Sequence, residues 1–316
     1  MSWQSGLCAA AVRCALQARM ARLGFPESAV LLDRTLERGA SLLPLPRHVR
    51  VAPASVGGVP CQWVDAADPH GAPVIVYLHG GAFVAGSART HRDTAWRLSH
   101  ESGARVLLVE YRLAPSHPFP AALLDAISAY EGLLAAGVPA QSIALAGDSA
   151  GGNLALAAAI GLRSLGAPSP AAIACFSPWV DLTLSGDAPR DGRGGESMLT
   201  RGFLRAAARA YAGRESLQDP RVSPLFACLE GLPPLLLHAA SGELLLDDSR
   251  RLQQRARAAG VPSVLRAWPG QLHAFPTFAS VVPEARAALA ETAAFLAGHL
   301  APRAAALSSG RDSVLS

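Results

Sequence analysis

The sequence contains no lysine, so all 28 of its Lys-plus-Arg residues are arginine. This absence excludes several catalytic centres, because a Schiff base, a Walker A phosphate site and a Ser-x-x-Lys acylation centre each need a lysine amine. The net charge is +4, but the arginines are dispersed along the chain. The densest group, Arg250 to Arg257, is interleaved with Leu252 and Ala256, as on the solvated face of a helix. We therefore expect no nucleic-acid partner.

Long apolar runs and a cysteine pattern are also missing. No run approaches the roughly 20 residues of a membrane-spanning helix, so we expect no integral membrane segment. Residues 1–20 lack the basic start of a signal peptide, and Arg13 interrupts their apolar stretch, which favours an amphipathic helix. The five cysteines are scattered without a C-x-x-C pair: Cys8, Cys14, Cys61, Cys175 and Cys228. A reducing, cytoplasmic location is the simplest expectation.

Short apolar runs alternate with helix-forming stretches along most of the chain. The predicted strands are 47–51, 61–64, 74–78, 106–109, 143–146, 172–176, 235–239 and 264–267, and the helices include 92–102, 121–136, 153–165, 247–259 and 283–299. This alternation predicts a mostly parallel α/β sheet with helices on both faces. The first two strands are joined through Gly57-Gly58 and should form an antiparallel hairpin at one edge. Because half of the 316 residues are hydrophobic, one large core is sufficient.

A candidate nucleophile lies in Gly147-Asp148-Ser149-Ala150-Gly151, between an apolar run and a helix-forming run. The pattern G-x-S-x-G is typical of a nucleophile elbow, a strained strand-to-helix turn that holds a serine hydroxyl in the open. The bare pattern is only moderately specific in a chain rich in alanine and glycine, but the flanking strand and helix support it. We predict that Ser149 is the nucleophile and that Asp148 has a structural hydrogen-bonding role.

An oxyanion hole is predicted at His79-Gly80-Gly81-Ala82, which follows the apolar run 73–78. Alone, this segment would indicate only a turn after a strand. Followed about seventy residues later by an elbow, it matches the loop that supplies oxyanion-binding amides in such hydrolases. The expected donors are the amides of Gly80, Gly81 and Ala150.

The general base should follow the nucleophile and the acid in the chain order Ser, Asp/Glu, His. His273 lies in a loop after the apolar run 263–268, where this base is expected. His238 lies within an apolar run and should be a packed strand residue, and His299 lies on the last helix.

Three carboxylates compete for the role of the acid. Glu243 is nearest the end of the preceding strand and is the predicted partner of His273. Asp247 and Asp248 are expected in the first turn of the next helix, where carboxylates complement the helix dipole. Asp247 remains the alternative acid.

Five motifs resemble the bacterial hormone-sensitive-lipase family of α/β-hydrolases, over about residues 49–299. They are HGGAF (79–83), YRLAPSHPFPAAL (111–123), GDSAGGNLA (147–155), SPWVDLT (177–183) and WPGQLHAF (268–275). The resemblance implies an α/β-hydrolase fold with an eight-stranded, mostly parallel sheet and a helical cap. It also implies Ser149 as nucleophile and His273 as base. Two residues depart from the family pattern: Ala82 replaces its third glycine, and Glu243 stands at its usual aspartate position.

The resemblance also implies a division of the chain. Two segments outside the alternation, 1–45 and 185–221, would form the cap over a core of 46–184 and 222–300, although plain surface helices are an alternative. The polar, glycine-rich part of the second segment, 185–197, resembles a mobile lid connection. Residues 301–316 should be a disordered tail.

We therefore predict a serine carboxylesterase that cleaves short- to medium-chain esters through an acyl-enzyme, without a metal or cofactor. Its partner is a small-molecule ester, and a homodimer is left open. The alternative enzymes are a lactone hydrolase and a deacetylase of a secondary metabolite. A ligand-binding protein is less favoured, because the gibberellin receptors that resemble this family have lost the histidine that His273 retains.

Overall fold

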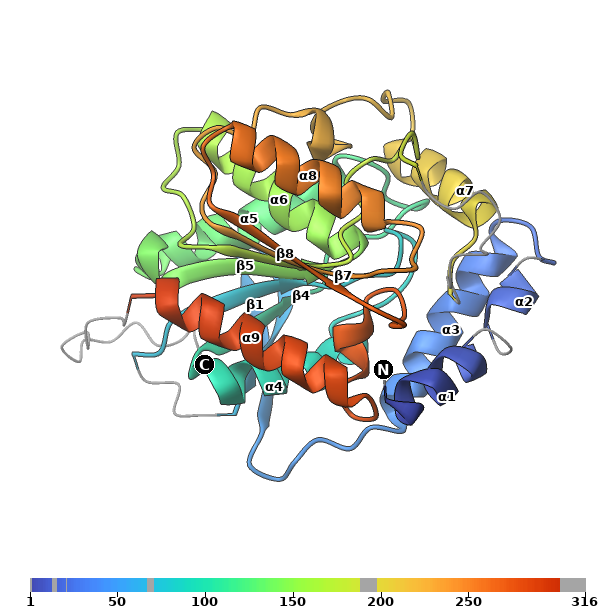
Figure 1. Ribbon diagram of the computed structural model, residues 1–316. Coiled ribbons are helices and arrows are strands. Elements are labelled where there is room, and N and C mark those ends of the chain that lie inside the picture. The colour runs from blue at the N-terminus through green and yellow to red at the C-terminus, as the bar shows by residue number, and fades with distance from the viewer. Residues whose placement is uncertain (1, 13–15, 21, 67–70, 188–197, 302–316) are drawn as a thin grey trace.

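The computed structural model describes residues 2–12, 16–20, 22–66, 71–187 and 198–301 (Figure 1). Its sheet has eight strands in the order β1-β2-β4-β3-β5-β6-β7-β8. They are β1 (Arg50–Val56), β2 (Val59–Asp65), β3 (Val74–Leu78), β4 (Arg105–Val109), β5 (Ile143–Asp148), β6 (Ile173–Phe176), β7 (Leu235–Ala240) and β8 (Ser263–Trp268). β2 pairs antiparallel with both β1 and β4, and every other pair is parallel. The predicted mostly parallel sheet is confirmed.

The hairpin at the β1 edge is confirmed, but the predicted bounds of its first strand are wrong. Gly57 and Gly58 both have positive φ, +60° and +77°, as a tight two-residue connection requires. The strand itself runs through Arg50–Val56 and contains Pro53. An edge strand needs no continuous apolar run and tolerates proline, so the apolar pattern alone placed it too early.

Helices cover both faces of the sheet (Figure 1). One layer contains α5 (Ala121–Ala135), α6 (Ala150–Ser164) and α8 (Leu246–Ala258), and the other contains α4 (Arg92–Ser102) and α9 (Pro283–His299). Short turns of helix are η2 (Arg89–His91), η3 (Ala140–Ser142), η4 (Pro224–Phe226) and η5 (Phe275–Phe278). Because successive strand side chains point to opposite faces, Val76 packs into the first layer, whereas Tyr77 packs into the second.

Four further helices lie together at one side of this sandwich: α1 (Trp3–Val12), α2 (Ala18–Met20), α3 (Glu27–Ser41) and α7 (Arg201–Ala212) (Figure 1). Gln17 Nε2 donates a hydrogen bond to the Leu199 carbonyl (3.3 Å), which joins the segment between α1 and α2 to the residues before α7. Residues 24–26 lie between α2 and α3, which begins at Glu27. Most of the proposed lid connection, 188–197, and the tail from 302 lie outside the described residues. No helix in the described ranges has the length and apolarity to span a bilayer.

Candidate active site

Ser149 lies at a sharp turn between β5 and α6, with φ +52° and a buried side chain. The flanking glycines are sterically required. A Cβ atom added to Gly151 would lie 1.9 Å from the Leu78 carbonyl oxygen, and one added to Gly147 would lie 2.5 Å from the backbone of Gly151. The strand, turn and helix predicted around Ser149 are therefore confirmed.

The loop after β3 corrects one predicted oxyanion donor. The Gly80 amide donates a hydrogen bond to Asp148 Oδ1 (2.9 Å), so this donor is already engaged and its assignment was wrong. The next two residues, Gly81 and Ala82, have φ values of +124° and +55° and line the same cavity as Ser149. Within the described ranges, the amides of Gly81, Ala82 and Ala150 donate no hydrogen bond, so they are available to a ligand.

Asp148 has the structural role expected of it, through contacts that the sequence did not reveal. Its Oδ1 also accepts a hydrogen bond from the Tyr77 hydroxyl (2.9 Å) and lies 3.1 Å from His91 Nε2. Burial opposes charge on Asp148, but attraction to His91 outweighs it and leaves the Asp148 pKa below its ordinary value. The same pairing raises the pKa of His91 against the effect of burial. Asp148 therefore fixes the elbow both to the loop at Gly80 and to η2.

The predicted acid and base are in contact. Glu243 follows β7 and His273 follows β8, and His273 Nδ1 lies 2.7 Å from Glu243 Oε2. Both side chains are buried, and Glu243 Oε1 also accepts a hydrogen bond from the Ala240 amide (3.1 Å). His273 and Ser149 line one cavity. The structure thus brings Ser149, Glu243 and His273 to the carboxyl ends of β5, β7 and β8, where ligands bind in open α/β sheets.

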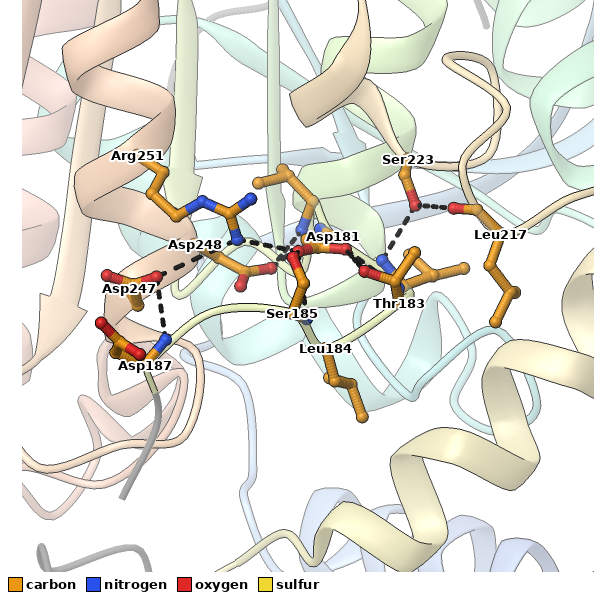
Figure 2. A network of polar contacts seen from close by, with 12 residues as sticks. Asp181, Thr183, Leu184, Ser185, Asp187, Leu217, Ser223, Asp247, Asp248 and Arg251 are labelled. Carbon is orange, nitrogen blue, oxygen red and sulfur yellow. Dashed lines mark hydrogen bonds and ion pairs between the residues drawn. The ribbon is translucent and has the colours of Figure 1, made fainter. Parts of the chain in front are cut away.

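Asp247 and Asp248 lie in the first turn of α8, as predicted. Oδ2 of the buried Asp248 carboxyl group accepts hydrogen bonds from the amides of Val180 and Asp181, both at 2.9 Å. Burial raises the pKa of Asp248 to about 8. Asp247 Oδ2 accepts from the Asp187 amide (3.3 Å), as Figure 2 shows. Both aspartates therefore hold the chain that follows β6.

The two histidines that were not predicted to be the base, His238 and His299, also lie where predicted. His238 is buried in β7, where its Nδ1 accepts a hydrogen bond from Trp268 Nε1 (2.9 Å). Burial lowers the pKa of His238 to about 4, so it stays neutral at physiological pH. His299 is exposed at the end of α9.

The segment 176–181 contacts the turn at Ser149, the loop that carries His273 and the first turn of α8, which sequence reasoning missed although its SPWVDLT motif was recognised. Ser149 donates through its amide to the Phe176 carbonyl (2.8 Å) and accepts from the Trp179 amide at its own carbonyl (3.1 Å). Ser177 Oγ accepts a hydrogen bond from the Ala274 amide (2.9 Å), beside the base. At the other end of the segment, the amides of Val180 and Asp181 donate to Asp248. We call residues 176–181 the bracing segment.

Asp181, at the end of the bracing segment, is itself firmly held (Figure 2). Its buried carboxylate accepts hydrogen bonds from Arg251 Nη1 (2.8 Å), Ser185 Oγ (2.5 Å) and the Thr183 hydroxyl. Burial opposes ionisation, yet these donors keep the pKa of Asp181 below its ordinary value. The charged carboxylate therefore fixes α8 to the chain leaving the sheet.

The cavity beside Ser149 is small and partly apolar, with a volume of about 60 Å³. Leu32 and Leu36 of α3 form one part of its wall, and Met198 and Leu199 form another. Pockets for drug-sized ligands usually hold about 300–1,000 Å³. The helices outside the sandwich thus restrict the space that a substrate can occupy.

Known proteins resemble this chain in both fold and sequence. A family model described as the alpha/beta hydrolase fold matches residues 75–277. An acetyl-hydrolase of Streptomyces hygroscopicus is 41% identical over 242 residues, covering 77% of this chain and 81% of the relative. An esterase of Acinetobacter venetianus is 36% identical over 266 residues, covering 84% and 87%.

A solved structure extends the similarity over nearly the whole chain. The crystal structure of an esterase from the bacterial hormone-sensitive lipase family superposes with a TM-score of 0.88 at 37% identity. The match covers 95% of this chain and 99% of that esterase. With the motifs at the carboxyl edge of the sheet, these similarities show that the chain belongs to the bacterial hormone-sensitive lipase family of α/β-hydrolases.

Proposed function

We propose that this chain, a carboxylic ester hydrolase, cleaves short- to medium-chain esters through an acyl-enzyme formed on Ser149. The observation that carries the proposal is the 2.7 Å contact between His273 Nδ1 and Glu243 Oε2 at the sheet edge that also carries Ser149. A buried carboxylate on Nδ1 favours the tautomer whose Nε2 is free to accept a proton.

The proposed reaction has two steps. His273 Nε2 takes the hydroxyl proton of Ser149 as Oγ attacks the ester carbonyl, and Glu243 stabilises the resulting imidazolium. His273 then donates this proton to the departing alcohol, leaving the acid esterified to Ser149. A water molecule, deprotonated by the same histidine, attacks the acyl-enzyme and releases the carboxylic acid.

We propose that the amides of Gly81, Ala82 and Ala150 bind the oxyanion. Gly80 is not among these donors, because its amide already donates a hydrogen bond to Asp148. The methyl group at Ala82 does not remove an amide, and Ala82 lines the cavity with Ser149. Preorganised backbone donors of this kind stabilise the charge that develops in acyl transfer.

We further propose that α1–α3, with α7 and the residues before it, form the cap, and that only the part of it that lines the cavity limits acyl length. Leu32, Leu36, Met198 and Leu199 support this role, since they wall a cavity of about 60 Å³. Such a space suits an acetyl or butyryl group better than a long chain.

The cysteines support a proposed cytoplasmic location. Four cysteines are free thiols in the structure, as is usual in a reducing compartment: Cys8, Cys61, Cys175 and Cys228. Burial raises the pKa of Cys61 to about 12 and also raises that of Cys175, so neither is a reactive thiolate at neutral pH.

The experiment combines turnover with covalent capture. We expect wild-type protein to hydrolyse p-nitrophenyl butyrate and to gain one phosphonyl group at Ser149 after treatment with a fluorophosphonate, detected by peptide mass spectrometry. The Ser149→Ala and His273→Ala variants should each lose turnover by a factor on the order of 10⁴. Substantial esterase activity in folded Ser149→Ala protein would refute the mechanism.

A further inference from the structure

The first helix, α1, directs its two largest apolar side chains outward. The Ser2 hydroxyl (2.8 Å) and the Ser5 hydroxyl (2.9 Å) both donate to Glu284 Oε2, so the serine side faces the protein at the start of α9. Trp3 and Leu7, one helical turn apart, are instead 72% and 61% exposed. A surface helix ordinarily buries its apolar residues and exposes its polar ones. Cys8, Ala9 and Val12 pack inward against the core, so α1 is apolar on both sides and its outer side carries no charge.

Exposed apolar side chains are concentrated in this part of the molecule. Of nine large apolar side chains exposed among the described residues, five lie in the first 42 positions: Trp3, Leu7, Leu23, Val30 and Leu42. Single exposed apolar residues are normal on a protein surface, and Trp3 and Leu7 differ in lying one turn apart on the outer side of one helix.

The net positive charge is concentrated in the same segment. Residues 1–50 contain seven arginines and three carboxylates, whereas the remainder of the chain contains twenty-one of each. The whole excess of +4 therefore belongs to the segment that carries α1. Arg19 and Arg22 follow α1 closely and are exposed, as is Arg34 on α3.

We propose that α1 docks on the surface of a bilayer rich in anionic phospholipids, with Trp3 and Leu7 at the headgroup level. Tryptophan suits this depth because its ring is apolar and its N–H is polar, and nearby arginines add attraction to anionic headgroups. A second copy of the chain fits less well. A two-fold interface would place the same positive surfaces against each other.

Docking here would place the catalytic cavity close to the bilayer. α3 contributes Leu32 and Leu36 to the cavity wall and exposes Val30 and Arg34 on its outer side. Esters that partition into the headgroup region could then enter without crossing bulk water. This consequence for substrate supply rests on the proposed esterase function, whereas the docking itself does not.

The test is co-sedimentation of the full chain with vesicles. We expect binding to phosphatidylcholine vesicles containing about 30 mol% phosphatidylglycerol to be about tenfold stronger than to pure phosphatidylcholine vesicles. Raising the salt to about 0.5 M should remove most of this difference, because the Debye length becomes much shorter. The double variant Trp3→Ser/Leu7→Ser should bind the anionic vesicles about tenfold more weakly.

A matched control removes the same kind of exposed apolar surface elsewhere. Leu124 on α5 and Leu165, which follows the last residue of α6, are 49% and 66% exposed, and Leu124→Ser/Leu165→Ser should bind vesicles like the wild type. All three proteins should hydrolyse soluble p-nitrophenyl butyrate equally, and Ser149→Ala should bind vesicles like the wild type, which separates docking from catalysis. Equal binding by the wild type and the Trp3/Leu7 variant would overturn the proposal. So would a dimer, seen by light scattering, that only the Trp3/Leu7 variant dissociates.

Discussion

Replacing the Glu243 carboxylate by an amide tests how His273, the proposed base, is oriented. In the native site, one Glu243 oxygen faces His273 Nδ1 (2.7 Å) and the other accepts the Ala240 amide (3.1 Å). A glutamine has only one oxygen for these two positions. If the oxygen keeps the Ala240 amide, the NH₂ group of the glutamine faces His273 Nδ1 and requires it to be an acceptor.

The surroundings of the new side chain determine which of the two orientations of its amide is favoured. Turning the amide over would place its NH₂ group against the Ala240 N–H, and leaving that buried donor unpaired costs about 1–3 kcal/mol. We therefore expect Glu243→Gln to hold His273 with its proton on Nε2, where it cannot accept the Ser149 proton. The expected loss in kcat is roughly 10² to 10⁴, with little change in KM.

The assay is steady-state hydrolysis of p-nitrophenyl butyrate together with thermal melting. Asp247→Asn is the matched control, because Asp247 contacts the Asp187 amide and Arg251 and lies in the first turn of α8. It should keep near-native turnover and lose only about 0.3–1 kcal/mol of stability. A nearly inactive Asp247→Asn beside an active Glu243→Gln would refute the assignment of the acid.

Three further outcomes can be measured. Ser177→Ala should lower kcat about tenfold at nearly constant KM, because the Ala274 amide beside His273 loses its acceptor. The control Ser223→Ala, which loses hydrogen bonds to Leu182 and Leu217 instead, should lower only the melting temperature. Equal losses of kcat in the two variants would contradict a positioning role for Ser177. Asp248, with a pKa of about 8 in the folded protein, binds a proton more tightly than in the unfolded chain, so the stability of the wild type should fall as the pH rises from about 4 to 8. The free energy of unfolding of Asp248→Asn should depend less on pH over this range. The same pH dependence in both proteins would contradict the raised pKa. For p-nitrophenyl esters, kcat/KM should be highest at short acyl lengths and fall steeply for long chains, whereas strong activation on long-chain emulsions would contradict the small cavity.

Local patterns were sufficient to predict the sheet and the turn that carries Ser149. The strand at Val74–Leu78 and the helices at Arg92–Ser102 and Pro283–His299 have the predicted bounds, because continuous apolar runs and helix-terminal signals are properties of neighbouring residues. The turn at Ser149 is equally local, since the clashes that require Gly147 and Gly151 arise within the elbow and the adjacent strand.

The errors and omissions involve contacts between distant residues. The amide of Gly80 appeared free in the sequence because its acceptor, Asp148, lies 68 positions further along the chain. The contact of Ser177 with Ala274 spans 97 positions, and no local pattern of serines distinguishes it. The partnership of His91 with Asp148 was missed for the same reason.

The bracing segment has a consequence for how such an enzyme changes its substrate range. Because the nucleophile, the base loop and Asp248 are all tied to residues 176–181, the geometry of the reacting groups belongs to the central sheet. The walls formed by Leu32 and Leu36 belong to a helix that makes none of these bonds. Selectivity and reactivity are therefore encoded in separate parts of the chain. Under the proposed function, substitutions on α3 would change which esters are accepted, whereas a small displacement of β6 would disturb Ser149 and the loop of His273 together.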